Sequence, residues 1–398
     1  MSIRVPKGFQ LAGVHCGIKQ ASQTEDLTLL VAEKPAVAAG VYTKNLVHAA
    51  PVALDRKRTP SDRIRAVVVN SGNANACTGN RGMRDAREMT RLAAAACGAE
   101  EDQALVLSTG IIGEFLPMTK ISAGIEAAKS RLGCDAAALV SAARGLMTTD
   151  TIHKLAGRVL SLGGQEVLVT GLAKGAAMIG PNMATMLGVI LTDAALKPQA
   201  AQVALASVVD VSFNCISVDG HTSTNDSVLL LASGAAGSGE PLVGDDLAAF
   251  SEALEEVCVE LARSIPADGE GATHLITIEV AGCRHPVEAH TIAKTVANSP
   301  LVKTAVAGAD PNWGRIVSAA GYCGVPFDPA GVSLRVNGFL LYEAGAPVGF
   351  DAAAVSDSIR NNHDTLLRLD LGEGDAAGRF WTSDLTADYV RLNADYHT

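Results

Sequence analysis

Thr185 is the residue whose type and setting most directly suggest covalent chemistry. It lies in GPNMATMLGVILTDA, residues 180–194, where a Gly-Pro-Asn turn leads into a run typical of a buried strand. Threonine is a good strand former, so a structural role is the alternative. In the functional interpretation, the Thr185 hydroxyl attacks the carbonyl of Ala184, and cleavage leaves an N-terminal threonine. Its new α-amine is less basic than a lysine amine and can act as the base for the hydroxyl.

A threonine nucleophile needs N–H groups that stabilise the oxyanion formed during its attack. Backbone amides suit this role because they are fixed dipoles that need no reorganisation during the reaction. The segment STGIIGE, residues 108–114, is a candidate. Gly110 allows the backbone to turn its amides toward a substrate. An ordinary turn at the end of a strand is the alternative interpretation.

Other polar loops contain candidate binding residues, each with a structural alternative. MTTDT, residues 147–151, places hydroxyls around one carboxylate, a pattern also typical of a helix cap. NSGNANACTG, residues 70–79, is typical of a tight structural loop. Lys174 follows an apolar run, where its ammonium can bind a carboxylate or lie in solvent. Glu270, among glycines in ADGEGATH, can bind an amine or lie on a flexible turn.

The elements that must position these residues follow an α/β pattern. β-branched runs at 37–45, 65–76 and 104–110 alternate with longer segments rich in alanine and leucine. Residues 158–180 read as a hairpin that turns at Gly163-Gly164. Further strands are expected within 271–283 and 332–347.

One helix is predicted over residues 244–263. Apolar residues recur there at spacings of three and four, and Asp245 or Asp246 is available as the cap. No internal repeat, low-complexity linker or domain boundary interrupts the chain. We therefore expect one interwoven body.

Composition narrows the class of protein. The 398 residues are 48% hydrophobic and 19% charged, which is typical of a packed globular protein. The net charge is −10, from 32 basic and 42 acidic residues, and no basic stripe favours nucleic acid. The N-terminus lacks a signal-peptide pattern and no apolar run approaches the length of a membrane span, so we expect an unanchored cytoplasmic protein.

Cysteine and histidine give no support for a metal site. Eight cysteines and nine histidines are scattered without a CxxC pair, an HExxH motif or zinc-ligand spacing. The expectation is a protein without a bound metal or resident cofactor.

Taken together, the motifs resemble the ornithine acetyltransferase family, also called the glutamate N-acetyltransferase family. The resemblance extends almost from end to end, so it does not depend on a single motif. It covers PKGFQLAGVHCGIK (6–19), VVNSGNANACTG (68–79), STGIIGEFLPM (108–118), MTTDT (147–151), AKGAAMIGPNMATMLGVILTDA (173–194), SVDGHTSTNDS (217–227), DGEGATHLI (268–276), GADPNWGRI (308–316) and LNADYHT (392–398).

The resemblance implies self-cleavage between Ala184 and Thr185. The products would be an alpha chain, 1–184, and a beta chain, 185–398, which fold together into one body and assemble as a heterotetramer of two alpha and two beta chains. Thr185 would be the nucleophile, with Thr109 and Gly110 forming the oxyanion hole. The substrate-binding residues implied are Thr148, Lys174, Thr185, Glu270, Asn393 and Thr398.

The implied fold is a layered α/β sandwich with central β-sheets flanked by helices, of the aminopeptidase and ornithine acetyltransferase type, similar in logic to N-terminal nucleophile hydrolases. The implied reaction is ping-pong transfer of acetyl from N²-acetylornithine to glutamate, with no cofactor, and bifunctional members also use acetyl-CoA. A related self-cleaving aminopeptidase is the nearest alternative, although such relatives typically use serine. A non-catalytic family member serving as an assembly or regulatory subunit is another.

Several positions depart from the usual family pattern. Ala176 and Ala177 stand where serine and glycine are common, and Gly180 stands where a larger residue is usual. His153 follows MTTDT where proline is frequent, and Cys215 stands where a basic residue often lies. These departures leave Thr185 unchanged, but they bear on donor preference and on the rate of cleavage.

Overall fold

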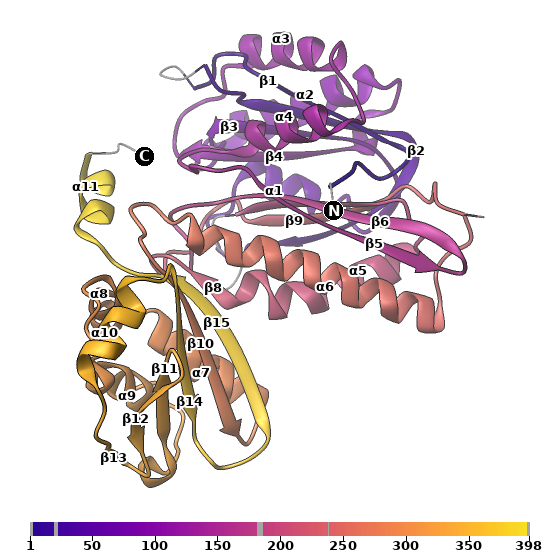
Figure 1. Ribbon diagram of the computed structural model, residues 1–398. Coiled ribbons are helices and arrows are strands. Elements are labelled where there is room, and N and C mark those ends of the chain that lie inside the picture. The colour runs from indigo at the N-terminus through magenta and orange to yellow at the C-terminus, as the bar shows by residue number, and fades with distance from the viewer. Residues whose placement is uncertain (1–2, 20–22, 181–185, 238, 396–398) are drawn as a thin grey trace.

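The computed structural model describes residues 3–19, 23–180, 186–237 and 239–395. Its strands form two β-sheets with helices packed on their faces (Figure 1). The first sheet has the order β4-β3-β2-β9-β7-β6-β5, and β1 also pairs with β2. Its strands are β1 (Phe9–Val14), β2 (Leu27–Tyr42), β3 (Ser61–Asn73), β4 (Ala104–Ile111), β5 (Lys154–Leu162), β6 (Gln165–Lys174), β7 (Leu187–Thr192) and β9 (Ser227–Ala232).

The long strand β2 joins the two halves of the first sheet. Residues 27–32 pair with β1, and residues 37–42 pair with β9, while β3 pairs along the other side. The registry with β3 shifts between Val31 and Ala36, where Pro35 lacks the N–H that a regular ladder needs. Because of this break, β2 pairs with β1 along its first part and with β9 along its last part.

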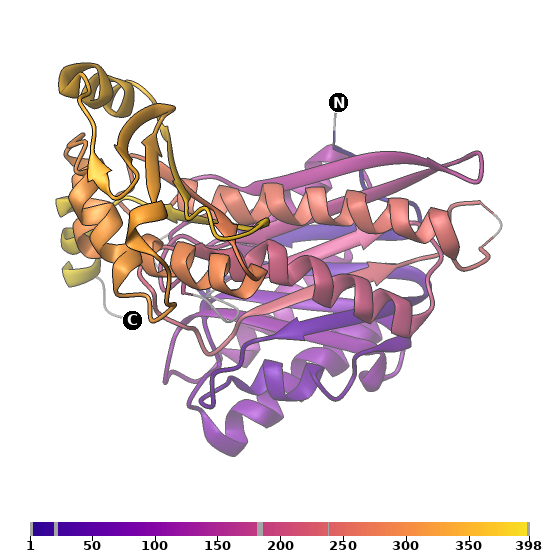
Figure 2. The same cartoon turned by 90° about the horizontal axis from the view of Figure 1, so that it is seen from below.

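Helices cover both sides of the first sheet. The contacts place α2, α3 and α4 around β1, β2 and β3, while α5 and α6 pack beside each other against β2, β5 and β6 (Figure 2). The helices are α1 (Ala50–Asp55), α2 (Gly79–Ala96), α3 (Met118–Lys129), α4 (Ala136–Leu146), α5 (Pro198–Val211), α6 (Gly244–Ala267), α7 (Pro286–Ala297), α8 (Pro300–Ala307), α9 (Trp313–Gly321), α10 (Ala352–Arg360) and α11 (Ala387–Asp395), with short 3₁₀ turns at Glu101–Gln103, Phe213–Cys215 and Pro329–Gly331.

The second sheet forms a lobe that projects from the first (Figure 1). Its order is β13-β12-β11-β14-β10-β15-β8, and α7 packs on β10 and β15. Buried side chains of both sheets, such as Ile190 and Leu334, belong to one continuous hydrophobic cluster. The strands are β8 (Ile216–Ser217), β10 (Leu275–Cys283), β11 (Ser333–Val336), β12 (Phe339–Glu343), β13 (Ala346–Pro347), β14 (Asp364–Asp370) and β15 (Ala376–Ser383).

The expected layered α/β class is confirmed, and so are the predicted hairpin and the predicted helix, although the cap of that helix needs a correction. Gly163 and Gly164 both have positive φ, as a two-residue hairpin turn between β5 and β6 requires. The helix predicted at 244–263 extends to Ala267. The prediction that Asp245 or Asp246 caps this helix is wrong. The N-cap residue is Val243, whose side chain makes no capping hydrogen bond, and Asp245 lies in the first turn. There its charge is favourable near the positive end of the helix dipole.

The first sheet combines strands from both sides of residues 181–185. β6 pairs with β7 in antiparallel fashion, and β2 pairs with β9. Every residue of β7 and β9 is buried, as is typical of strands covered on both faces. The segments before and after residues 181–185 therefore share one ladder and one core.

Candidate functional site

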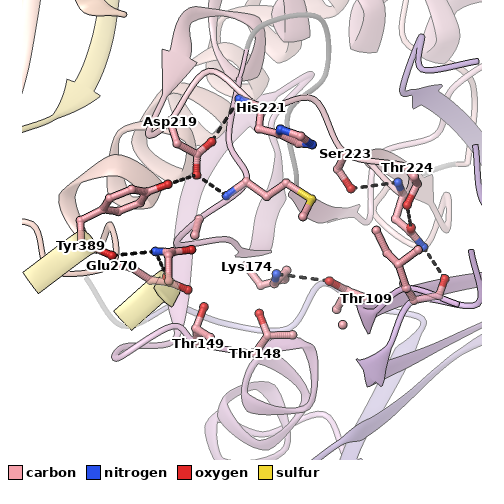
Figure 3. Close-up of a pocket in the computed structure, with 17 residues that line it drawn as sticks. Thr109, Thr148, Thr149, Lys174, Asp219, His221, Ser223, Thr224, Glu270 and Tyr389 are labelled. Atoms are coloured by element: carbon pink, nitrogen blue, oxygen red, sulfur yellow. Dashed lines mark hydrogen bonds between the residues drawn. The ribbon is translucent and has the colours of Figure 1, made fainter. Parts of the chain in front are cut away.

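A cavity of about 310 Å³ lies where several segments of the first sheet meet the C-terminal helix (Figure 3). Its wall combines apolar surface with hydroxyls, carboxylates, an ammonium and an imidazole. The residues that line it are Ala74, Thr109, Gly110, Ile112, Thr148, Thr149, Lys174, Ala177, Met178, Asp219, His221, Ser223, Thr224, Asn225, Glu270, Tyr389 and Asn393. The volume suits a small polar ligand.

Thr109 and Gly110 enter the wall from the end of β4. Gly110 has a φ of 131°, and a Cβ there would lie 2.3 Å from the carbonyl carbon of Gly72 in β3. Only glycine fits this backbone conformation and this close approach. The conformation expected of Gly110 from the sequence is therefore present at the cavity edge.

Lys174, the last residue of β6, is buried and points into the cavity. Its Nζ lies 3.3 Å from Thr109 Oγ1, to which it donates a hydrogen bond (Figure 3). Burial lowers the pKa of Lys174, and the nearby carboxylate of Asp150 opposes that shift. The alternative of a solvated surface lysine is wrong.

The MTTDT segment forms a loop rather than the start of a helix. It follows α4 and precedes β5, so the helix-cap interpretation is wrong. Asp150 instead accepts the backbone N–H of Thr148 at 3.0 Å and that of Gly175 at 2.6 Å. One carboxylate thus fixes Thr148 next to the strand end that presents Lys174.

Glu270 and Asn393 meet across the cavity from distant parts of the chain. Asn393 Nδ2, on α11, donates to Glu270 Oε2 at 2.9 Å. The backbone N–H of Glu270 donates to the carbonyl of Ala176 at 2.9 Å. The first contact brings the C-terminal helix to the cavity, and the second ties Glu270 to the segment that follows Lys174.

Asp219 and Tyr389 are cavity residues that the sequence analysis missed as individual candidates. Asp219 accepts N–H groups from Met178 at 2.6 Å and Ile179 at 2.9 Å, and Tyr389 OH donates to it at 3.2 Å. Asp219 lies in SVDGHTSTNDS, a segment of the family resemblance, but no signal within that segment distinguishes this carboxylate from its polar neighbours. Its importance arises from contacts with residues far along the chain.

Asn225 also lines the cavity, but its side-chain amide is hydrogen-bonded to the backbone around the cavity. Both amide hydrogens are used, one toward the carbonyl of Ala74 at 2.6 Å and one toward that of Ser108 at 2.8 Å. The side chain therefore fastens β4 to the neighbouring loop and has no amide hydrogen left for a ligand.

Ala184, Thr185 and Thr398 lie outside the described residues, while the residues next to the 181–185 segment are described. Met186 donates its backbone N–H to Asp226 Oδ1 at 3.1 Å, and burial raises the pKa of that carboxyl well above its usual value. Leu187 pairs with Lys174 in the ladder between β6 and β7. The strand that follows Thr185 in the sequence thus begins directly beside Lys174.

All six described candidate residues line this cavity, namely Thr109, Gly110, Thr148, Lys174, Glu270 and Asn393.

The structure shows the surroundings of two residues that depart from the family pattern, Gly180 and Cys215. A Cβ on Gly180 would lie 2.2 Å from the carbonyl carbon of Gly220, so a larger residue does not fit there. Cys215 lies outside this cavity, with its Sγ 3.7 Å from His290 Nδ1.

Within residues 3–19, 23–180, 186–237 and 239–395, no group of three His, Cys, Asp or Glu side chains is arranged to hold a metal ion. Over the same ranges, no helix is long and apolar enough to cross a membrane.

The fold and the cavity define a two-sheet α/β protein with a small polar site built from both sides of residues 181–185. A protein-family model described as the ArgJ family matches residues 10–398. A relative from Rhodopirellula baltica is 47% identical over 99% of this chain and 96% of its own. One from Symbiobacterium thermophilum is 48% identical over 100% of this chain and 98% of its own. Both are named arginine biosynthesis bifunctional protein ArgJ.

A solved structure of the protein of that name from Bacillus halodurans is 39% identical, with a TM-score of 0.50. The match covers 51% of this chain and 96% of the solved one. The chain described here belongs to the ArgJ family.

Proposed function

We propose that this protein is a glutamate N-acetyltransferase that moves acetyl from N²-acetyl-L-ornithine to L-glutamate in arginine biosynthesis. The observation that carries the proposal is the convergence of Thr109, Lys174 and Glu270 in one small cavity beside the start of β7. The chain also shares its family, at 47% identity over nearly full length, with a relative named for arginine biosynthesis.

The first proposed step is self-cleavage, which gives chains 1–184 and 185–398. The Thr185 hydroxyl attacks the carbonyl of Ala184, and the peptide C–N bond breaks to leave an ester. Water then hydrolyses the ester, so Ala184 ends as a carboxylate and Thr185 keeps its hydroxyl and a free α-amine.

Acetyl transfer then follows a ping-pong sequence. The α-amine of Thr185 removes the hydroxyl proton as the oxygen attacks the acetyl carbonyl; the amide C–N bond breaks, and ornithine leaves with the proton on its amine. Glutamate next attacks the acetyl ester, and the Thr185 hydroxyl regains its proton. Thr109 and Gly110 stabilise the oxyanion in both halves, where one lost donor typically costs about 10²–10³ in kcat.

The charges around the cavity suit a substrate with both a carboxylate and an amine. Lys174 is assigned to the α-carboxylate, and Glu270, held by Asn393, is assigned to an amine. Thr148 and the terminal Thr398 complete the proposed binding set. Ornithine and glutamate are both α-amino acids, so one site can bind them in turn.

The remaining parts of the proposal concern donors, assembly and location. Acetyl-CoA is proposed as a second donor, used as a substrate, with no resident cofactor. The processed chains are proposed to form a heterotetramer of two alpha and two beta chains in the cytoplasm. The name of the relatives, arginine biosynthesis bifunctional protein, supports the second donor.

The test uses purified protein with N²-acetylornithine carrying a ¹³C-labelled acetyl group. Addition of glutamate is expected to give labelled N-acetylglutamate and an equal amount of ornithine, and Thr185→Ala is expected to remain one uncut band without transfer. Labelled acetate released at the same rate with and without glutamate would instead identify a hydrolase. An intact wild-type band without either product would support the non-catalytic alternative.

A further inference from the structure

Lys154, the first residue of β5, is a buried lysine that does not line the cavity. Only 2% of the residue is exposed, and its Nζ donates to Asp150 Oδ1 at 2.7 Å and to Asp268 Oδ2 at 2.6 Å. A buried ammonium is costly unless it is paired and hydrogen-bonded. The carboxylates of Asp150 and Asp268 provide that pairing.

Asp150 connects this buried ammonium to two cavity walls. It accepts the backbone N–H of Thr148 and that of Gly175, the residue after Lys174. Burial disfavours its ionised form, but the charges of Lys174 and Lys154 and the hydrogen bonds outweigh burial and hold the pKa of Asp150 at about 2. Asp150 is therefore an anion under ordinary conditions.

Asp268 connects the same ammonium to a third wall. Its Oδ2 accepts the backbone N–H of Thr151 at 3.1 Å and that of Ile152 at 3.4 Å. It lies two residues before Glu270, in the turn that ends α6. Lys154 thus stands at the junction of three segments, each of which presents a polar side chain to the cavity.

We propose that Lys154 is a positioning residue for the cavity and acts through Asp150 and Asp268. The proposal rests on the function proposed above and adds a residue that the family resemblance did not assign. Its ammonium holds together the loop with Thr148, the strand end with Lys174 and the turn with Glu270. A misplacement of about 1 Å in such walls can cost 10²-fold in rate.

The charge of Lys154 also affects the pKa of Lys174. A residue that only packed in the core would have no such effect, so this pKa distinguishes the two roles. The positive charge of Lys154 lowers the pKa of Lys174, while Asp150 raises it. The charged and titratable groups that face Lys174 are Asp150, Lys154, Asp226, Glu270 and Lys19. Removal of Lys154 is expected to raise the pKa of Lys174, because a like charge disappears and the opposing anion remains.

The test uses Lys154→Met and the double variant Lys154→Met with Asp268→Asn. Lys154→Met alone leaves an unpaired buried carboxylate and can prevent folding. The double variant removes one positive and one negative charge, so the net buried charge is unchanged and the variant can be tested if the single variant does not fold. Val169→Ala is the control for lost packing, because it truncates a buried side chain on the neighbouring strand β6. Folding is checked by thermal melting.

The pKa of Lys174 is measured by an NMR titration of lysines labelled with ¹³C at Cε, with Lys174→Met used to assign the signal. The pKa of Lys174 is expected to rise in both Lys154 variants and to stay unchanged in Val169→Ala. In acetyl transfer, kcat/KM is expected to fall about 10- to 100-fold in both, and its alkaline limb to move to higher pH.

The proposal is overturned if the pKa of Lys174 is unchanged in folded Lys154 variants, or if the double variant regains wild-type kcat/KM. The titration does not depend on activity. A wild type without acetyl transfer therefore rejects the proposed function, while the NMR result decides the role of Lys154 separately.

Discussion

At the scale of single residues, Lys174 combines full burial with an ammonium that faces the cavity. Burial lowers its pKa, Lys154 lowers it further, and Asp150 raises it. A lysine with a lowered pKa loses its charge at a lower pH than an ordinary lysine. If the charged form binds the substrate carboxylate, binding must weaken on the alkaline side before a solvent-exposed lysine would titrate.

We predict that Lys174→Met raises the KM for N²-acetylornithine and for glutamate by about 10-fold or more, because a charge-assisted hydrogen bond is worth roughly 1.5–3 kcal/mol. In the wild type, KM is expected to rise with pH as Lys174 loses its proton, and this rise is expected to vanish in the variant. Steady-state kinetics across the pH range provide the measurement. Unchanged kcat/KM for both substrates would refute the assignment.

At the scale of secondary structure, the ends of β4 and β6 place the polar groups. β4 ends against β3, and the two backbones approach so closely at Gly110 that no side chain fits. β6 ends at Lys174, beside the start of β7. The reactive geometry therefore depends on strand ends that are fixed by their ladders.

We predict that Gly110→Ala lowers both stability and activity. The new Cβ would lie 2.3 Å from the Gly72 carbonyl carbon in a backbone of φ 131°, so β4 must shift and its amides turn away. The expected loss in kcat is about 10²-fold or more. Gly113→Ala is a matched control, because Gly113 also has positive φ, at 87°, but has open space around it. Equal kcat in the two variants would contradict the prediction.

At the scale of the whole molecule, the first sheet makes the two proposed chains inseparable in the folded state. The ladders of β6 with β7 and of β2 with β9 join residues before 181 to residues after 185. The same hydrophobic cluster contains Ala173 and Ile190. A cut between Ala184 and Thr185 would remove one peptide bond but leave these contacts in place.

We therefore predict that the cleaved chains elute together in size-exclusion chromatography and separate only in denaturant. Denaturing electrophoresis of the eluted peak is expected to show both bands in equal amounts. Two separate peaks under native conditions would contradict the shared sheet as the source of their association.

The position of α11 leads to a second prediction at this scale. Asn393 on that helix donates to Glu270 at the cavity, and residues 396–398 come next in the sequence. An added C-terminal tag is expected to reduce acetyl transfer more than the same tag at the N-terminus. Equal kcat/KM for the two tagged proteins would argue against a role for the C-terminus at the site.

Much of the local structure and of the candidate site could be predicted from the sequence. The hairpin at Gly163-Gly164 and the helix from Gly244 follow from turn chemistry and periodicity. The motifs identified Thr109 and Lys174, because motif residues are recognised by type and spacing. By contrast, no local pattern distinguishes a buried Lys174 from a solvated one.

The sequence by itself determined the α/β class, the family and six described residues that line the cavity. The tertiary structure alone decided that Lys174 is buried against Thr109 and that Asp219 and Tyr389 share the wall. It also decided that Lys154 bridges Asp150 and Asp268. The physical reason is that local preferences act over a few residues, whereas burial, charge pairing and close backbone approach also depend on groups far apart in the chain. Lys174 and Thr109 are 65 residues apart, and Lys154 and Asp268 are 114 apart.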